Sequence, residues 1–163
     1  MNPLWLDSPC KMKVLTPQQA KEKIQRYCVY QERSHQEVRN KLYEYGLHRT
    51  DVDEIITALI TDGFLSEERF AKAFAGGKFR MKKWGRIKIT HALEARGVSR
   101  NCILIGLREI DSEAYIKVLR ELLKAKSHQL GEVNVYERRD RLSRYAIQKG
   151  FESELVWKEI MAL

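Results

Sequence analysis

Three glycines, Gly46, Gly97 and Gly150, close three amphipathic runs at nearly equal intervals along the chain. When the three glycines are aligned, the residues eight and four positions before each one are apolar in every copy. Those one, six, ten and thirteen positions after each glycine are apolar as well. These steps follow the period of a buried helical face, and glycine readily adopts the left-handed conformation that ends a helix. The sequence therefore predicts a helix, a glycine turn and a second helix, repeated three times.

The aligned apolar positions are expected to form the core. They are Val38, Leu42, Leu47, Val52, Ile56 and Leu59; Ile89, Leu93, Val98, Ile103, Leu107 and Ile110; and Leu142, Ala146, Phe151, Val156, Ile160 and Leu163. Only 44% of the chain is hydrophobic, so chance accounts poorly for this agreement. A unit of this size buries little apolar surface by itself, and the stacking of neighbouring units extends the hydrophobic core. We expect an all-α fold of three tandem three-helix repeats, stacked into an elongated, curved array.

Helix-start signals divide the chain into these repeats. Thr16 and Ser34 each begin a capping-box pattern, in which Gln or Glu follows three residues later. The expected parts are a loose leader at 1–15, a first repeat at 16–63, a second, basic repeat at 64–110 and a third repeat at 111–163. In the second repeat we expect Phe74 to pack inward, and Gly76 and Gly77 to fray or bend the first helix.

The composition of the chain limits the classes of function that it can have. The net charge is +8, with a pI of about 9.4, which favours a polyanionic partner: nucleic acid, an anionic membrane face or an acidic protein surface. The three cysteines are far apart, the histidines do not cluster, and no nucleophile–base pair or phosphate-binding loop occurs. We therefore expect no metal, no cofactor and no enzymatic activity. Without a signal peptide or a long apolar run, a cytoplasmic protein is expected.

The positive charge is concentrated in one stretch of the second repeat. Glu94 is the only acid between residues 78 and 101, and Phe79 and Trp84 lie among the cations. The cations are Lys78, Arg80, Lys82, Lys83, Arg86, Lys88, Arg96 and Arg100. Clustered cations bind phosphates, and nearby aromatic rings stack on bases, so we interpret this stretch as a nucleic-acid or filament contact. The alternative interpretation is a solvated basic helix face.

A second basic surface is predicted near the C-terminus. It comprises Arg138, Arg139, Arg141 and Arg144. The alternative is that these arginines cover a helix flank with their aliphatic stems.

A helix-turn-helix that binds DNA is an alternative interpretation of the segments around Gly46 and Gly97. Ordinary helix packing with a glycine cap is preferred, because the motif recurs three times with different surface residues.

The pattern resembles the RecX family, small bacterial proteins that regulate the recombinase RecA. The likeness covers about residues 17–163. The residues that carry it are Arg33-Ser34-x-x-Glu37-Val38-x-x-Lys41-Leu42-x-x-x-Gly46, Gly63-Phe64-Leu65-Ser66, Phe70-Ala71, Phe74, Lys78, Trp84-Gly85-x-x-Lys88-Ile89-x-x-x-Leu93-x-x-x-Gly97-Val98 and Lys149-Gly150-Phe151. The sequence departs from the family pattern at Ala146, where a large residue is expected, and at Lys78, where many members have arginine.

The resemblance implies an all-helical protein that binds RecA filaments and, more weakly, single-stranded or double-stranded DNA. It also implies inhibition of RecA's recombinase and ATPase activities in DNA repair and the SOS response. No catalytic residues are implied, and we expect a monomer that does not bind membranes. The alternative is a helical nucleic-acid-binding module that acts independently of RecA.

Overall fold

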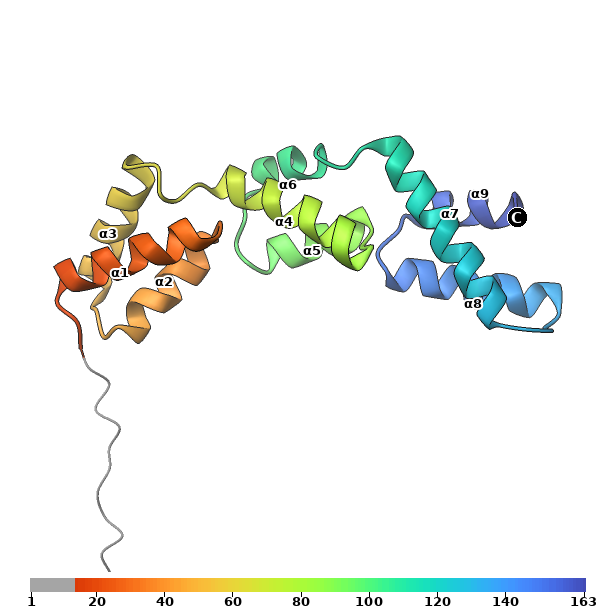
Figure 1. The fold of residues 1–163 in the computed structure, drawn as a ribbon, viewed down its shortest axis with the longest axis horizontal. Helices are drawn as coiled ribbons and strands as arrows, with labels where there is room; N and C mark the ends of the chain where they lie inside the picture. Colours follow the sequence, from red (N-terminus) through yellow and green to blue (C-terminus); the bar gives the residue numbers. More distant parts are fainter. Residues whose placement is uncertain (1–13) are drawn as a thin grey trace, which may run out of the picture. The chain divides into compact units, whose positions relative to one another are not determined.

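The computed structural model describes residues 14–163, which form nine α-helices and no strand (Figure 1). The helices are α1 (Pro17–Tyr30), α2 (His35–Glu44), α3 (Arg49–Thr61), α4 (Glu67–Lys82), α5 (Arg86–Glu94), α6 (Arg100–Leu107), α7 (Ser112–Gln129), α8 (Val135–Gln148) and α9 (Ser153–Met161). The predicted all-α fold class is confirmed. Residues 1–13 of the predicted leader lie outside the described residues. No helix in the described part has the length and apolar content that crossing a bilayer requires.

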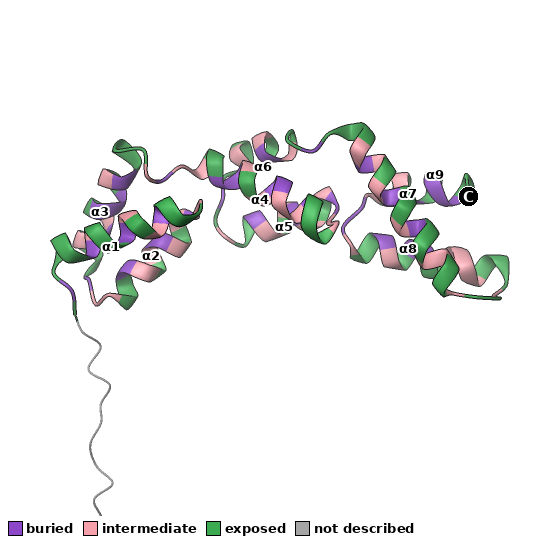
Figure 2. Cartoon of the chain, viewed as in Figure 1, coloured by how far each residue is buried: buried purple, intermediate pink, exposed green. Residues whose placement is uncertain are grey.

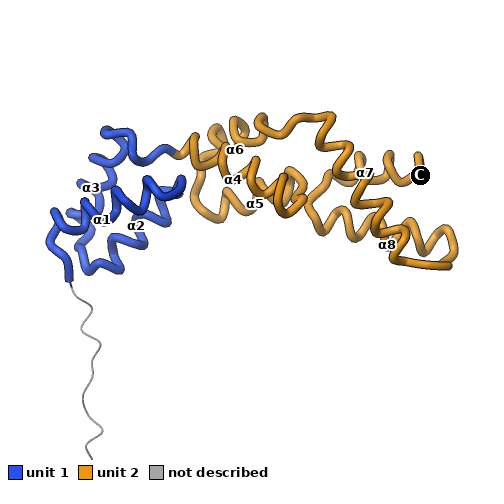
Figure 3. Tube along the Cα trace, in the orientation of Figure 1, with its two compact units in different colours: residues 1–66 blue, residues 67–163 orange. Residues whose placement is uncertain are grey.

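The chain divides into two compact units, Met1–Ser66 and Glu67–Leu163 (Figure 3). The first unit contains α1 to α3, and the second contains α4 to α6 followed by α7 to α9. Within the second unit, α4 packs on α5 and α6, and α7 packs on α8 and α9. The three repeat boundaries that the sequence predicts stay a prediction.

Both capping boxes predicted for the first unit are present. Thr16 Oγ1 accepts a hydrogen bond from the Gln19 N–H at 3.3 Å, and the Gln19 side chain accepts one from the Thr16 N–H at 3.2 Å. Ser34 and Glu37 make the same reciprocal pair. Leu15, at the end of the predicted leader, is buried against this unit's core. The first unit therefore begins before its first helix.

Almost all of the aligned apolar positions are buried in the core (Figure 2). Sixteen of the eighteen are buried, Leu107 is partly buried, and Leu163 is 57% exposed. The three aligned glycines have φ of +83°, +71° and +94°, so all three adopt the predicted left-handed conformation. In the second unit, Tyr115 lies between two further rings, with its centre 5.8 Å from Phe79 and 4.9 Å from Phe151.

Helix α4 runs without interruption through Gly76 and Gly77, so the expected fraying is wrong, while the expected bending stays a prediction. Its packing against α6 explains the difference. A Cβ at Gly106 of α6 would lie 2.7 Å from the Ala71 carbonyl oxygen, so the two helix backbones touch. This close packing outweighs the weak helix propensity of the two glycines.

A backbone contact between two turns joins the two halves of the second unit. The Gly85 N–H donates to the Lys149 carbonyl at 2.8 Å, and the Ile87 N–H donates to the Gly150 carbonyl at 3.0 Å. A Cβ at Gly85 would lie 2.1 Å from the Gly150 oxygen, and a Cβ at Gly150 would lie 2.3 Å from the Lys88 Cβ. Only glycine fits at either position. We call this contact the glycine junction.

Leu93→Ala should lower the free energy of unfolding by about 2–5 kcal/mol, because Leu93 is fully buried and its truncation leaves a cavity. The matched control is Ile87→Ala on the same helix, where the side chain is 42% exposed. Urea denaturation measures both variants. Equal, small losses of unfolding free energy in both variants would contradict the placement of Leu93 in the core.

Gly85→Ala should destabilise the protein by about 1–3 kcal/mol, because the added methyl group overlaps the Gly150 backbone. Gly85 has φ of −75°, which alanine adopts without backbone strain, so the loss combines the overlap with Gly150 and the weaker N-capping of α5 by alanine. Gly77→Ala is the control. Nothing lies within 4 Å of its added Cβ, and alanine should stabilise α4 by about 0.5–1 kcal/mol. A Gly85→Ala variant as stable as the parent would contradict the junction.

Candidate functional site

Five side chains of the second unit form a continuous row of alternating cations and aromatic rings. Lys78 Nζ lies 5.2 Å from the ring centre of Phe74 and 5.2 Å from that of Trp84. Lys88 Nζ lies 4.9 Å from the Trp84 ring at one end, and Arg96 Cζ lies 4.8 Å from the Phe74 ring at the other. All these distances are within the range of cation–π attraction. We call these five residues the cation–aromatic row.

The α4–α5 turn brings the row together. Phe74 and Lys78 are four residues apart on α4 and so share one face of that helix. Lys83 has φ of +54°, a left-handed conformation that is uncommon for a residue with a side chain, and it reverses the chain after α4. The Trp84 N–H then points back to the Lys78 carbonyl at 3.4 Å, which places the Trp84 ring beside the lysine.

The three cations of the row have no acidic partner in the described part of the chain. Among the described residues, no carboxylate oxygen lies within 4 Å of Lys78, Lys88 or Arg96. Lys88 Nζ reaches the Gln148 carbonyl at 3.4 Å, and Arg96 Nη1 donates to the Ala92 carbonyl at 2.7 Å. Their positive charge is therefore uncompensated, beside aromatic rings that are only partly buried. This arrangement suits a ligand with both anionic groups and flat rings.

Arg86 belongs to the glycine junction more than to the row. Its guanidinium lies over the Tyr115 ring at 4.1 Å and 3.8 Å from Glu152 Oε1, while its backbone N–H donates to the Tyr115 hydroxyl at 2.9 Å. That hydroxyl in turn donates to Glu152 Oε2 at 2.6 Å. Burial, and then the Glu152 hydrogen bond, raise the pKa of Tyr115, so it stays protonated as the donor.

The other predicted contact residues lie apart from the row. Arg80, Lys82 and Arg100 are exposed, and Lys83 is partly buried in the turn. The structure thus brings three of the eight predicted cations into the row and places a fourth, Arg86, over Tyr115, and the role of all eight in binding stays a prediction.

Two of the three phenylalanines of α4, Phe74 and Phe79, take roles that the sequence did not assign to them. Phe79, which the sequence suggested as a base-stacking ring, is only 7% exposed and packs against Tyr115. Phe74 packs against the core, as expected, but it is only partly buried, and its ring also belongs to the row. The spacing of four residues between Phe74 and Lys78 was the signal that could have identified it.

The second predicted basic surface lies on α8. It comprises Arg138, Arg139, Arg141 and Arg144. Arg141 bonds to Glu137, and Arg144 Nη2 lies 3.1 Å from Asp140 Oδ2, so each has an acid one turn earlier on the same helix. These two positive charges are therefore largely compensated. Whether the set is a contact surface stays a prediction.

Comparison with known proteins gives consistent matches. A family model described as RecX, second three-helix domain, matches residues 66–105, a range that contains the whole row. A regulatory protein RecX from Lactobacillus johnsonii is 30% identical over 129 residues, which are 79% of this chain and 48% of that protein. One from Clostridium perfringens is 31% identical over 73% of this chain and 56% of its own length. The chain spans about half the length of these curated relatives.

Solved structures share the fold. The crystal structure of RecX from Lactobacillus salivarius superimposes with a TM-score of 0.82 at 18% identity, over 90% of this chain and 96% of that one. A second structure, of a regulatory protein RecX, also has a TM-score of 0.82 at 18% identity, and 72% of that chain is covered. At this identity the likeness establishes the fold alone.

Replacing Lys78 and Lys88 by glutamine should weaken binding to single-stranded DNA and reduce its salt dependence. Each phosphate contact that is lost reduces the number of counterions released on binding. The slope of log affinity against log salt should therefore become shallower by up to about 0.7 per lost contact. Fluorescence anisotropy of a labelled oligonucleotide at several salt concentrations measures the slope. The matched control replaces Arg141 and Arg144 by glutamine, which removes the same charge. An equal change in both double variants would mean that only net charge matters.

Proposed function

The chain belongs to the RecX family of regulatory proteins, and on this premise we propose that it binds RecA filaments on DNA. In this proposal it inhibits the recombinase and ATPase activities of RecA in DNA repair and the SOS response. It acts as a monomer in the cytoplasm, and its effect comes from binding, without a cofactor or a catalytic residue of its own.

The observation that carries the proposal is the cation–aromatic row. Its cations have no carboxylate within 4 Å in the described part of the chain, and its rings remain accessible. A RecA filament contains a nucleic acid along its length, so it offers both phosphates and bases to such a surface. The whole row also lies within the segment that matches the family model.

The repeated helical units favour a filament over free RecA. A chain with more than one unit can contact more than one protomer, and linked contacts raise the overall affinity without any new kind of contact. A protein that binds one state of the filament more tightly than another shifts RecA toward that state. Binding alone can therefore slow ATP turnover. The direction, inhibition, follows from the family resemblance.

A second candidate is a nucleic-acid-binding module that acts without RecA. The row itself favours it, because nothing in its geometry requires a recombinase. Single-stranded DNA or structured RNA would satisfy the same cations and rings. The two proposals differ in whether RecA increases the affinity of the chain for DNA.

Titrating the protein into a RecA ATPase assay, with single-stranded DNA and RecA from the same organism, should reduce the rate of ATP hydrolysis. The Lys78→Gln, Lys88→Gln double variant should inhibit less, because part of the contact to the filament is lost. The Arg141→Gln, Arg144→Gln variant should inhibit like the parent. An unchanged ATPase rate and unchanged strand exchange at saturating protein would reject the filament and favour the RecA-independent module.

A further inference from the structure

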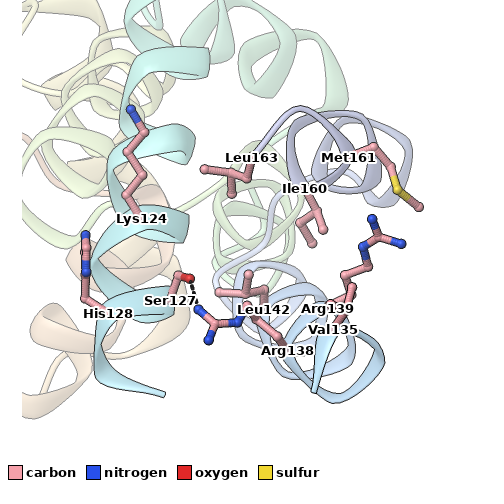
Figure 4. A pocket seen from close by; sticks show the side chains of 10 residues that line it. All are labelled: Lys124, Ser127, His128, Val135, Arg138, Arg139, Leu142, Ile160, Met161 and Leu163. Atoms are coloured by element: carbon pink, nitrogen blue, oxygen red, sulfur yellow. Dashed lines mark hydrogen bonds between the residues drawn. The ribbon is translucent and has the colours of Figure 1, made fainter. Parts of the chain in front are cut away.

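A groove of about 330 Å³ lies among α7, α8 and α9 of the second unit (Figure 4). Its lining combines aliphatic and cationic side chains from three helices and from the C-terminal residue. They are Lys124, Ser127 and His128; Val135, Arg138, Arg139 and Leu142; and Ile160, Met161 and Leu163. None of the five residues of the cation–aromatic row is among them, so the groove is a separate surface.

The base of the groove is aliphatic and continues into exposed apolar side chains. Leu142 and Ile160 are buried, with exposed fractions of 2% and 4%. Val135, Met161 and Leu163 border them and are 58%, 60% and 57% exposed. Three large apolar side chains, one at the start of α8, one at the end of α9 and one at the C-terminus, thus remain in water around one hollow, a pattern typical of a binding surface.

The border of the groove is positively charged. Lys124 and Arg139 have no carboxylate oxygen within 4 Å among the described residues, and neither Asp nor Glu lines the groove. Arg138 is held in place, since it donates to Ser127 Oγ at 2.9 Å, as Figure 4 shows, and to the Gly131 carbonyl at 2.7 Å. The cations therefore surround the apolar base with their charge uncompensated.

We propose that this groove binds an acidic, amphipathic segment of a partner protein. One apolar side chain of the segment packs on Leu142 and Ile160, and flanking carboxylates meet Lys124 and Arg139. This chemistry is the complement of the lining: apolar at the centre and negative at the edge.

Two other occupants fit less well. A nucleic acid would use the cations, but the floor of the groove, Leu142 and Ile160, is aliphatic, and His128 supplies the only ring in the lining on which a nucleobase could stack. A second copy of this chain carries a net charge of +8, so it would bring mostly like charge to a cationic border. The proposal goes beyond the proposed function, because it concerns a different surface and a different chemical class of ligand.

The test uses the full chain and a small set of synthetic helical peptides, each with one leucine or phenylalanine one turn from two glutamates. Binding should shift the methyl NMR signals of Met161 and Leu163, which border the groove. Replacing both Lys124 and Arg139 by glutamate should weaken the affinity for the acidic peptides by at least about tenfold, because electrostatic attraction to the peptide carboxylates becomes repulsion. The matched control replaces Arg141 and Arg144 by glutamate and should bind within about twofold of the parent.

Peptides with glutamine in place of glutamate, or alanine in place of the apolar residue, should bind more weakly than the parent peptides. If no peptide shifts these methyl signals, the proposal is overturned. It is also overturned if a single-stranded oligonucleotide shifts them instead, or if they change with protein concentration alone, which would indicate a second copy. Every one of these readouts is independent of RecA, so failure of the filament proposal leaves this test intact.

Discussion

The backbone contact between Gly85 and Gly150 is the constraint on which the second unit depends. It sets the α4–α5 turn directly on the α8–α9 turn, with two hydrogen bonds and no space for a side chain. Tyr115 closes the contact from the core, because its hydroxyl links the Arg86 backbone to Glu152. Since Trp84 directly precedes Gly85, the junction also fixes the Trp84 ring, which lies between Lys78 and Lys88 in the cation–aromatic row. The packing that stabilises this unit therefore positions its candidate site.

The first unit uses a related device at its own glycine turn. The Leu15 N–H donates to the Tyr45 carbonyl at 3.0 Å, and a Cβ at the adjacent Gly46 would lie 3.0 Å from a Val14 side-chain carbon. In both units an N–H from a distant segment reaches the carbonyl just before the turn glycine. Gly97 differs, because nothing in the described part of the chain lies within 4 Å of its Cβ position. There the left-handed backbone alone favours glycine.

The sequence was sufficient for features that depend on local structure and period. The glycine turns, the capping boxes and the buried faces repeat with helical spacing, and each can be recognised without knowing its tertiary partner. The site was harder, because Phe74 and Phe79 have the same chemistry and differ only in which neighbours α4 meets. The sequence does not distinguish Arg86 from the neighbouring cations, because its partners Tyr115 and Glu152 are distant in sequence and meet it only in the folded structure. The groove at α7 to α9 depends on three helices at once and has no sequence signature.

The row and the groove differ in chemistry and lie in the same compact unit. The row offers flat rings between cations, which suits phosphates and bases, whereas the groove offers an aliphatic base inside a cationic border, which suits a side chain of an acidic protein. Because one packed core holds both surfaces, no flexible linker needs to be ordered when both are occupied. A target that presents nucleic acid and protein at a fixed separation would then be bound more tightly than either alone. A nucleoprotein filament has this property along its whole length, while naked DNA and free protein do not. In the two proposals above, selectivity for an assembled filament therefore requires no single strong contact, only two moderate ones held in fixed geometry.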